Sequence, residues 1–179
     1  MSNNKLSLKQ RQQVSLDILK NVHNFCNENN IRYYIISGTL LGAIRHGGFI
    51  PWDDDIDIMM PRPDYERFLN IYKDDNYSVL RPQEGMYSYA KVYDTRTIKY
   101  EDDKEYSSNK PLGIDIDIFV LDGIVNDQEI LNKIYKKETI LEKFIILANQ
   151  PILKKGILKS INRIIPRIIG KKNLVKMRE

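Results

Sequence analysis

The 179-residue sequence predicts an α/β fold of the α+β type, in which a mixed β-sheet is flanked by helices. Apolar residues recur at helical spacing in residues 7–29 and again in 127–149, so we expect a helix in each segment. Between them lie short runs of β-branched and aromatic residues, which are typical of strands. Three of these runs, at 31–37, 77–80 and 90–93, are predicted strands, and two acidic segments supply the others.

The first acidic segment places four aspartates within five positions: Asp53, Asp54, Asp55 and Asp57. Alternate residues of a strand share a face, so a strand here would point Asp53, Asp55 and Asp57 one way. It would point Ile56 and Ile58 into the core. A solvated acidic run would not carry such apolar partners, so we expect a structured cluster of carboxylates.

The second acidic segment, at 112–119, alternates in the same way. It places Asp115 and Asp117 on one face and three isoleucines on the other. Two like charges ~4 Å apart repel by ~4 kcal/mol at an effective dielectric near 20, so gathered carboxylates need a cation. Mg²⁺ is bound through one or two carboxylates together with phosphate oxygens. The two strands therefore predict a metal site for phosphate chemistry.

A small residue and a hydroxyl, Gly38 and Thr39, follow the predicted strand at 31–37. A turn of this kind before a short helix at 40–45 lets a phosphate approach the backbone and the helix N-terminus. Arg45 is a candidate for a charge-assisted phosphate contact. Lys91 could balance the carboxylates or hold a phosphate, and the alternative is an ion pair with Asp94 or Glu101. Trp52 is expected to pack and stiffen its loop.

Composition indicates one domain with a basic end. Residues 151–179 hold nine Lys/Arg and one acidic residue. We expect residues 1–125 to form the catalytic core and 126–179 a basic helical extension of the same domain. A single cysteine, the lack of a signal-like N-terminus and the lack of a long apolar run favour a cytoplasmic protein.

The Gly-Thr turn, the Asp-x-Asp pair and the later strand aspartate resemble the nucleotidyltransferase fold of the polymerase-β type. The longer string GTLLGAIRHGGFIPWDDDIDIMMPRPDYERFL at 38–69 is similar to the LicD family of phosphocholine transferases, to which fukutin and fukutin-related protein also belong. KVYDTRT at 91–97 and IDIFVLDG at 116–123 extend the resemblance. Members of this family usually continue past this point, and the sequence is interpreted as a C-terminally short member.

The resemblance implies a transferase that moves a phospho-alcohol from a CDP-alcohol donor to a sugar hydroxyl of a surface glycan or lipid-linked sugar, and releases CMP. It implies one or two Mg²⁺ ions, with Mn²⁺ as a substitute. In this hypothesis Asp55, Asp57 and Asp117 are catalytic and bind metal with Asp53, and Asp115 is the second candidate for the role of Asp117. The proposed phosphate contacts are Gly38, Thr39, Arg45 and Lys91.

Two other functions remain open from the sequence. The same fold could transfer a nucleotide from an NTP to a small molecule or protein, or the chain could be an inactive, truncated, divalent-binding scaffold. The cationic helix expected at 151–169 could contact an anionic membrane surface, and the alternative is ordinary packing with a basic exposed face. No nucleic-acid-reading motif accompanies the basic residues, so no nucleic acid is expected as a partner.

Overall fold

The computed structural model describes residues 5–82, 84, 87–99, 112–124, 126–149 and 169. The chain divides into two compact units. The first unit comprises residues 1–81, 89–100 and 110–122 and contains the whole sheet. The second comprises residues 82–88, 101–109 and 123–179 and contains the helix α4 (Gln128–Asn149).

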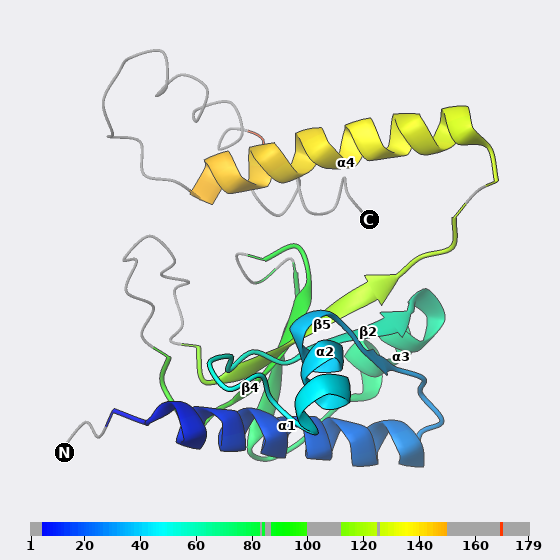
Figure 1. The fold of residues 1–179 in the computed structure, drawn as a ribbon. Helices are drawn as coiled ribbons and strands as arrows, with labels where there is room; N and C mark the ends of the chain where they lie inside the picture. Colours follow the sequence, from blue (N-terminus) through cyan, green and yellow to red (C-terminus); the bar gives the residue numbers. More distant parts are fainter. Residues whose placement is uncertain are drawn as a thin grey trace, which may run out of the picture. The chain divides into compact units, whose positions relative to one another are not determined.

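The sheet of the first unit has five strands in the order β1-β2-β5-β4-β3. Their bounds are β1 Tyr34–Ile35, β2 Asp57–Pro61, β3 Tyr77–Leu80, β4 Ala90–Asp94 and β5 Asp115–Leu121. Figure 1 labels three of them, β2, β5 and β4. β2 and β5 are parallel, and the other neighbouring pairs are antiparallel. The mixed sheet confirms the predicted fold class, and it places the two acidic segments on adjacent strands.

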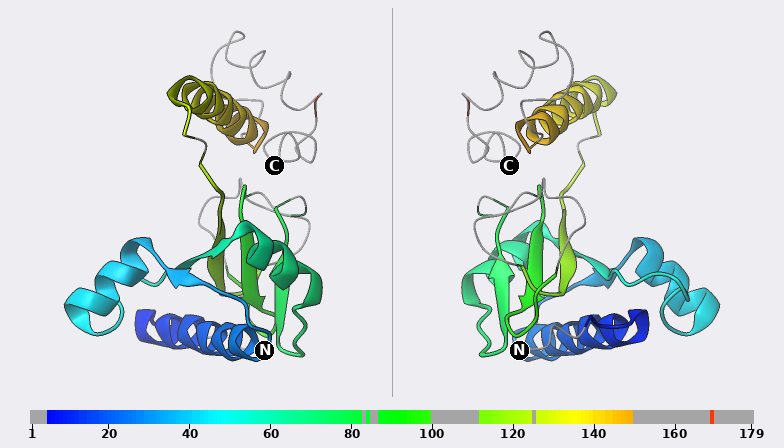
Figure 2. Two further views of the ribbon diagram at one scale, coloured as in Figure 1. Left: turned by 90° about the vertical axis from the view of Figure 1, so that its right-hand side faces the viewer. Right: turned by 90° about the vertical axis from the view of Figure 1, so that its left-hand side faces the viewer.

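Helix α1 (Leu8–Glu28) packs on one face of this sheet, against β4 and β5 (Figure 2). It begins with a capping box, in which the Ser7 side chain accepts from the Gln10 backbone and the Gln10 side chain accepts from the Ser7 backbone. Its apolar stripe buries Ile18, Val22 and Cys26 completely. The helix predicted at 7–29 is confirmed.

Helices α2 (Ser37–His46) and α3 (Arg62–Ile71) follow β1 and β2. The strand predicted at 31–37 was too long, because β1 ends at Ile35 and Ser37 already starts a helix. Ser37 has a φ of 51°, in the left-handed region that turns the chain sharply. As a result Gly38 and Thr39 lie in the first turn of α2, and the helix predicted at 40–45 is longer than expected.

The two faces of the sheet have opposite character. Even-numbered residues of the central strands pack with α1 and α3 in the apolar core, which includes Ile58, Met60, Phe68, Val92, Ile116 and Ile118. Odd-numbered residues, among them Asp57, Lys91 and Asp117, share the other face, as the strand register requires. The polar groups of the site therefore stand on a rigid sheet whose reverse side is the core.

The α4 helix confirms the helix predicted at 127–149. The Asp127 carboxylate caps its start by accepting from the backbone N–H groups of Glu129 and Ile130. The cationic helix predicted at 151–169, apart from residue 169, and the acidic loop predicted at 101–105 lie outside the described residues. None of the helices in the described part of the chain combines the length and apolar character needed to cross a bilayer.

Candidate active site

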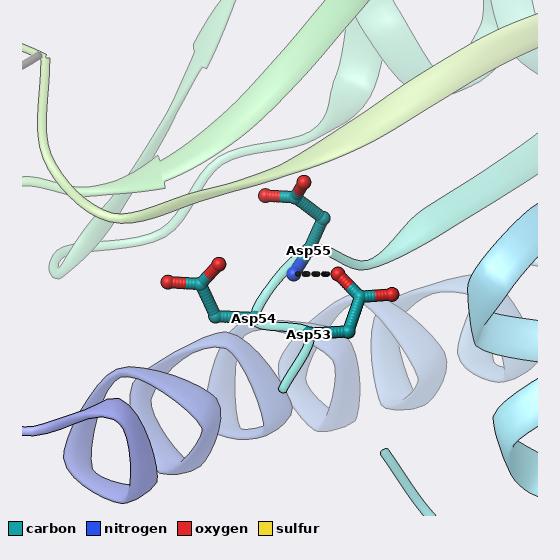
Figure 3. A group of neighbouring side chains, drawn as sticks. All are labelled: Asp53, Asp54 and Asp55. Atoms are coloured by element: carbon teal, nitrogen blue, oxygen red, sulfur yellow. Dashed lines mark hydrogen bonds between the residues drawn. The ribbon is translucent and has the colours of Figure 1, made fainter. Parts of the chain in front are cut away.

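The first three aspartates lie in a loop before β2, and the prediction that they belong to a strand was wrong. β2 begins only at Asp57, so Asp53, Asp54 and Asp55 precede it. Figure 3 shows their carboxylates around a tight bend, in which the Asp55 N–H lies 3.5 Å from an oxygen of Asp53. The alternation nevertheless persists, because Ile56 and Ile58 are buried while Asp55 is exposed and Asp57 half-buried.

Helix α1 takes the place of a strand partner for this loop. The Gln12 side-chain amide donates to the Asp53 carbonyl at 2.7 Å, and the Ser15 hydroxyl lies 3.5 Å from the Asp54 carbonyl. Arg11 forms a 2.7 Å ion pair with the Asp54 carboxylate. In a sheet these two backbone carbonyls would accept hydrogen bonds from a neighbouring strand. Here they accept them from the Gln12 and Ser15 side chains of α1. The sequence prediction missed these groups, although Ser15 stands on the apolar stripe of α1 and is 1% exposed.

The start of α2 contacts the acidic residues directly. The Asp57 backbone N–H donates to the Thr39 hydroxyl at 2.8 Å, so Thr39 positions the first residue of β2. A Cβ on Gly38 would lie 2.8 Å from the Asp53 carboxylate, so the glycine makes room for it. The side chain of Ser37, which the prediction did not single out, acts to lower the pKa of the Asp57 carboxyl.

The parallel pairing of β2 and β5 places Asp57 directly beside Asp117. Lys91 lies opposite Asp117 on β4, on the other side of β5. Its ammonium is 2.5 Å from Oδ1 of Asp117 and 2.6 Å from Oδ2 of Asp115. Of the two alternative partners suggested from the sequence, Asp94 pairs with Arg96 instead. Glu101 lies outside the described residues, so an ion pair of Lys91 with Glu101 stays a prediction.

A second lysine reaches the same cluster. Lys99 lies 2.9 Å from the other oxygen of Asp115, so one buried carboxylate holds two ammonium groups. The Asp115 side chain is 3% exposed and the Lys91 side chain 5% exposed, whereas Lys99 is 35% exposed. Lys99 was missed from the sequence, although it follows the KVYDTRT segment by only two residues.

Desolvation and like charge raise the pKa of the site carboxyls. Loss of hydration next to the surrounding protein is the main cause at Asp55, Asp57 and Asp117, although Asp55 as a whole residue is exposed. Neighbouring aspartates raise the pKa of each further. The charge of Lys99 opposes this most strongly at Asp55, and the charge of Lys91 does so at Asp117. Desolvation and the neighbouring carboxylates therefore both disfavour the ionised form of these three groups.

Arg45 and Trp52 stand apart from these contacts. Arg45 is exposed in the last turn of α2, where its guanidinium donates to the His46 ring at 3.0 Å. Its proposed phosphate contact stays a prediction. Trp52 is 74% exposed, so the expectation that it packs within its loop was wrong. The chain turns at this point, and a 3.0 Å hydrogen bond from the Asp53 N–H to the Ile50 carbonyl closes the turn.

The donor atoms fit a hard divalent cation. Asp53, Asp54 and Asp55 each offer a carboxylate oxygen, and these oxygens lie within 4.8 Å of one another. Asp57 and Asp117 are not in this group of three; they pair with each other on β2 and β5. Carboxylate oxygens are ligands that Mg²⁺ and Mn²⁺ favour. A cation among these oxygens would relieve the repulsion between neighbouring carboxylates, which raises the pKa of Asp55, Asp57 and Asp117.

The fold and the sequence comparison together give the class of the protein. A mixed sheet with a Gly-Thr helix start, an Asp-x-Asp segment and a third aspartate on the adjacent parallel strand agrees with the nucleotidyltransferase domain that the matching family model describes. The family model described as LicD/FKTN/FKRP, nucleotidyltransferase domain, matches residues 30–145. The chain therefore belongs to the LicD family.

Similarity to individual proteins agrees with this assignment. The chain is 39% identical over 140 residues to the lipopolysaccharide cholinephosphotransferase LicD of Haemophilus influenzae, a match covering 74% of this chain and 51% of that protein. It is 36% identical over 95 residues to the mouse ribitol 5-phosphate transferase FKRP, covering 48% of this chain and 16% of that protein. An uncharacterised Rickettsia typhi protein is 45% identical over 65 residues, covering 36% of this chain and 21% of that protein. The chain thus spans about half the length of the Haemophilus relative and less of the others.

Proposed function

We propose that this chain transfers a phospho-alcohol, phosphocholine or a similar group, from a CDP-alcohol to a sugar hydroxyl of a cell-surface glycan. The relatives with stated activities support this class, because one is a lipopolysaccharide cholinephosphotransferase and another a ribitol 5-phosphate transferase. Both names describe transfer of a phosphate-linked alcohol. The proposed acceptors are lipopolysaccharide, capsule or teichoic acid.

The observation that carries the proposal is the pairing of Asp57 with Asp117 beside the exposed Asp55. In the proposed reaction the acceptor hydroxyl oxygen attacks the phosphorus that bears the alcohol. The bridging P–O bond of the pyrophosphate breaks, and CMP leaves with the bridging oxygen. A carboxylate on this face, for which we propose Asp117, takes the hydroxyl proton.

The proposed ligands of a divalent ion are Asp53, Asp55, Asp57 and Asp117. When bound, Mg²⁺ or Mn²⁺ would neutralise the phosphate oxygens of the donor. Gly38 and Thr39 support this set indirectly, because Gly38 leaves space for Asp53 and Thr39 holds the backbone of Asp57. Lys91 is proposed to balance charge within the site. Membrane contact through residues 151–179 stays a prediction.

Ligand-dependent thermal unfolding tests the proposal without needing the acceptor. The protein is heated with Mg²⁺ and, in turn, CDP-choline, CDP-ribitol, CDP-glycerol, CTP, ATP and UTP. A ligand at 100 times its dissociation constant adds about 2.7 kcal/mol to the free energy of unfolding, which raises the midpoint by several degrees. We expect a metal-dependent shift with a CDP-alcohol.

Variants make this test specific. Asp55→Asn and Asp57→Asn should each remove the shift and leave the protein folded, whereas Asp75→Asn, at an exposed aspartate of the first unit, should retain it. A shift with NTPs alone would favour nucleotidyl transfer instead. An unchanged shift in Asp57→Asn would contradict the metal assignment.

A further inference from the structure

One buried carboxylate, that of Asp115, organises two lysines beside the proposed metal ligands. Oδ2 of Asp115 lies 2.6 Å from the Lys91 ammonium and Oδ1 lies 2.9 Å from the Lys99 ammonium. Asp115 and Lys91 are almost completely shielded from water, with side chains 3% and 5% exposed. A buried ion pair with both oxygens occupied is a fixed element of structure and not a transient surface contact.

Lys91 also places its charge against the catalytic face. Its ammonium is 2.5 Å from Oδ1 of Asp117, and the register of β4 and β5 holds the two residues directly opposite each other. Its positive charge acts on Asp55 and Asp57 as well. A cation supplied by the chain therefore lies within the carboxylate cluster, and its charge reaches both β2 and the residue Asp55 of the preceding loop.

The two carboxylates of β5 differ in how many of their oxygens contact lysine. Both oxygens of Asp115 and Oδ1 of Asp117 contact ammonium groups. A second divalent ion bound between Asp115 and Asp117 would have to displace Lys91, and would leave a buried ammonium without its partners. Removing one partner of a buried ion pair is strongly destabilising, so the exchange is unfavourable.

We propose that Lys91 takes the place of a second divalent cation, so that the site binds one metal ion, and that Asp115 is the residue that positions Lys91 and Lys99 beside it. The single ion would be held by Asp55 and Asp57, together with Asp117, whose Oδ1 already contacts Lys91. Lys99 is the more exposed of the two lysines, and in this proposal it contacts a phosphate oxygen of the donor. The inference rests on the proposed function, because it assigns the metal to the same carboxylates.

Counting bound ions tests the inference. The protein is dialysed to equilibrium against Mn²⁺, with and without CDP, and the Mn²⁺ held per chain is measured. One ion per chain in both conditions is the expected result. Two ions per chain would overturn the role of Lys91 while keeping the proposed function, and no bound ion would overturn the proposed function itself.

A variant that keeps both carboxylates of β5 extends the count. Lys91→Met removes the ammonium and leaves Asp117 and Asp115 in place, and Asp115 still contacts Lys99. We expect this variant to bind a second Mn²⁺ in the presence of CDP. Retention of one ion, in a variant that unfolds cooperatively, would show that Lys91 does not occupy the place of a cation.

Asp115→Asn alone tests the positioning role. With Lys99 released, binding of inorganic pyrophosphate with Mn²⁺ should weaken by about tenfold, while the count of bound Mn²⁺ stays at one. Asp94→Asn is the matched control, because Asp94 is also buried and paired, with Arg96. It should lower stability without changing pyrophosphate affinity. Loss of the Mn²⁺ in Asp115→Asn would make Asp115 a metal ligand and overturn its positioning role.

Discussion

Thr39 shows how one residue can have a different role from the one its sequence suggests. The Gly-Thr pair reads as a phosphate-binding turn, yet the Thr39 hydroxyl accepts the backbone N–H of Asp57. The hydroxyl thus joins the first turn of α2 to the first residue of β2. It acts on the site through the position of Asp57, and a contact with phosphate is a separate prediction.

We therefore expect Thr39→Val to lower the free energy of unfolding by about 1–3 kcal/mol, because a half-buried N–H loses its acceptor. Binding of Mn²⁺ should weaken as well, since Asp57 is no longer held. Thr39→Ser keeps the hydroxyl and is the control. Urea unfolding and Mn²⁺ titration of the two variants measure both effects, and equal stability of Val and Ser variants would contradict the role.

At the scale of elements, the close approach of α2 to the loop after it fixes the entrance to the acidic segment. A Cβ on Gly42 would lie 2.5 Å from the Gly48 carbonyl oxygen and 3.0 Å from the Ile50 nitrogen. Both are backbone atoms, so they cannot move aside as a side chain can. The helix and the chain that leads to Asp53 therefore pack backbone to backbone.

Gly42→Ala should destabilise the protein by roughly 1–3 kcal/mol through this overpacking. Alanine is the better helix former by about 1 kcal/mol, so propensity alone predicts the opposite sign. Gly48→Ala is the matched control, because a Cβ there meets nothing within 4 Å. Thermal unfolding should give Gly42→Ala a lower midpoint than Gly48→Ala. A Gly42→Ala protein as stable as the wild type would exclude the tight contact.

At the scale of the whole molecule, the site makes stability depend on pH in a defined direction. The pKa values of Asp55, Asp57 and Asp117 are raised, chiefly by burial, so the folded protein binds protons more tightly than the unfolded chain. The protonated forms of these three groups therefore stabilise the folded protein. This contribution to the free energy of unfolding is fully present below the ordinary aspartate pKa of about 3.9 and is lost as the pH rises through the raised pKa values. Asp122 has the opposite sign, because its hydrogen bonds with Arg62 lower its pKa.

Without metal, Asp57→Asn should accordingly be more stable than the wild type at pH 7, and the difference should shrink as the pH falls towards 4. With Mg²⁺ the order should reverse, because only the wild type gains the ion. Thermal unfolding in a chelator and in Mg²⁺ across this pH range measures the effect. A pH-independent difference between the two proteins would show that Asp57 does not carry the raised pKa.

The sequence alone determined the fold class, the position of most helices and strands, and the grouping of acidic residues on one side of the sheet. Alternation of Asp and Ile in 112–119 and helical spacing in 7–29 are local patterns, and local patterns follow from backbone geometry. The family was also visible in the string at 38–69, and the comparisons confirmed it.

Tertiary structure decided which groups meet. Asp53–Asp55 form a loop because Gln12 and Ser15 of α1 satisfy its backbone, and residues some 40 positions apart cannot be paired from local pattern. Lys91 contacts Asp115 and Asp117, and not Asp94, because the antiparallel register of β4 and β5 sets its neighbours. Side-chain identity fixed what chemistry was available, and the order of strands in the sheet fixed which charges compensate one another.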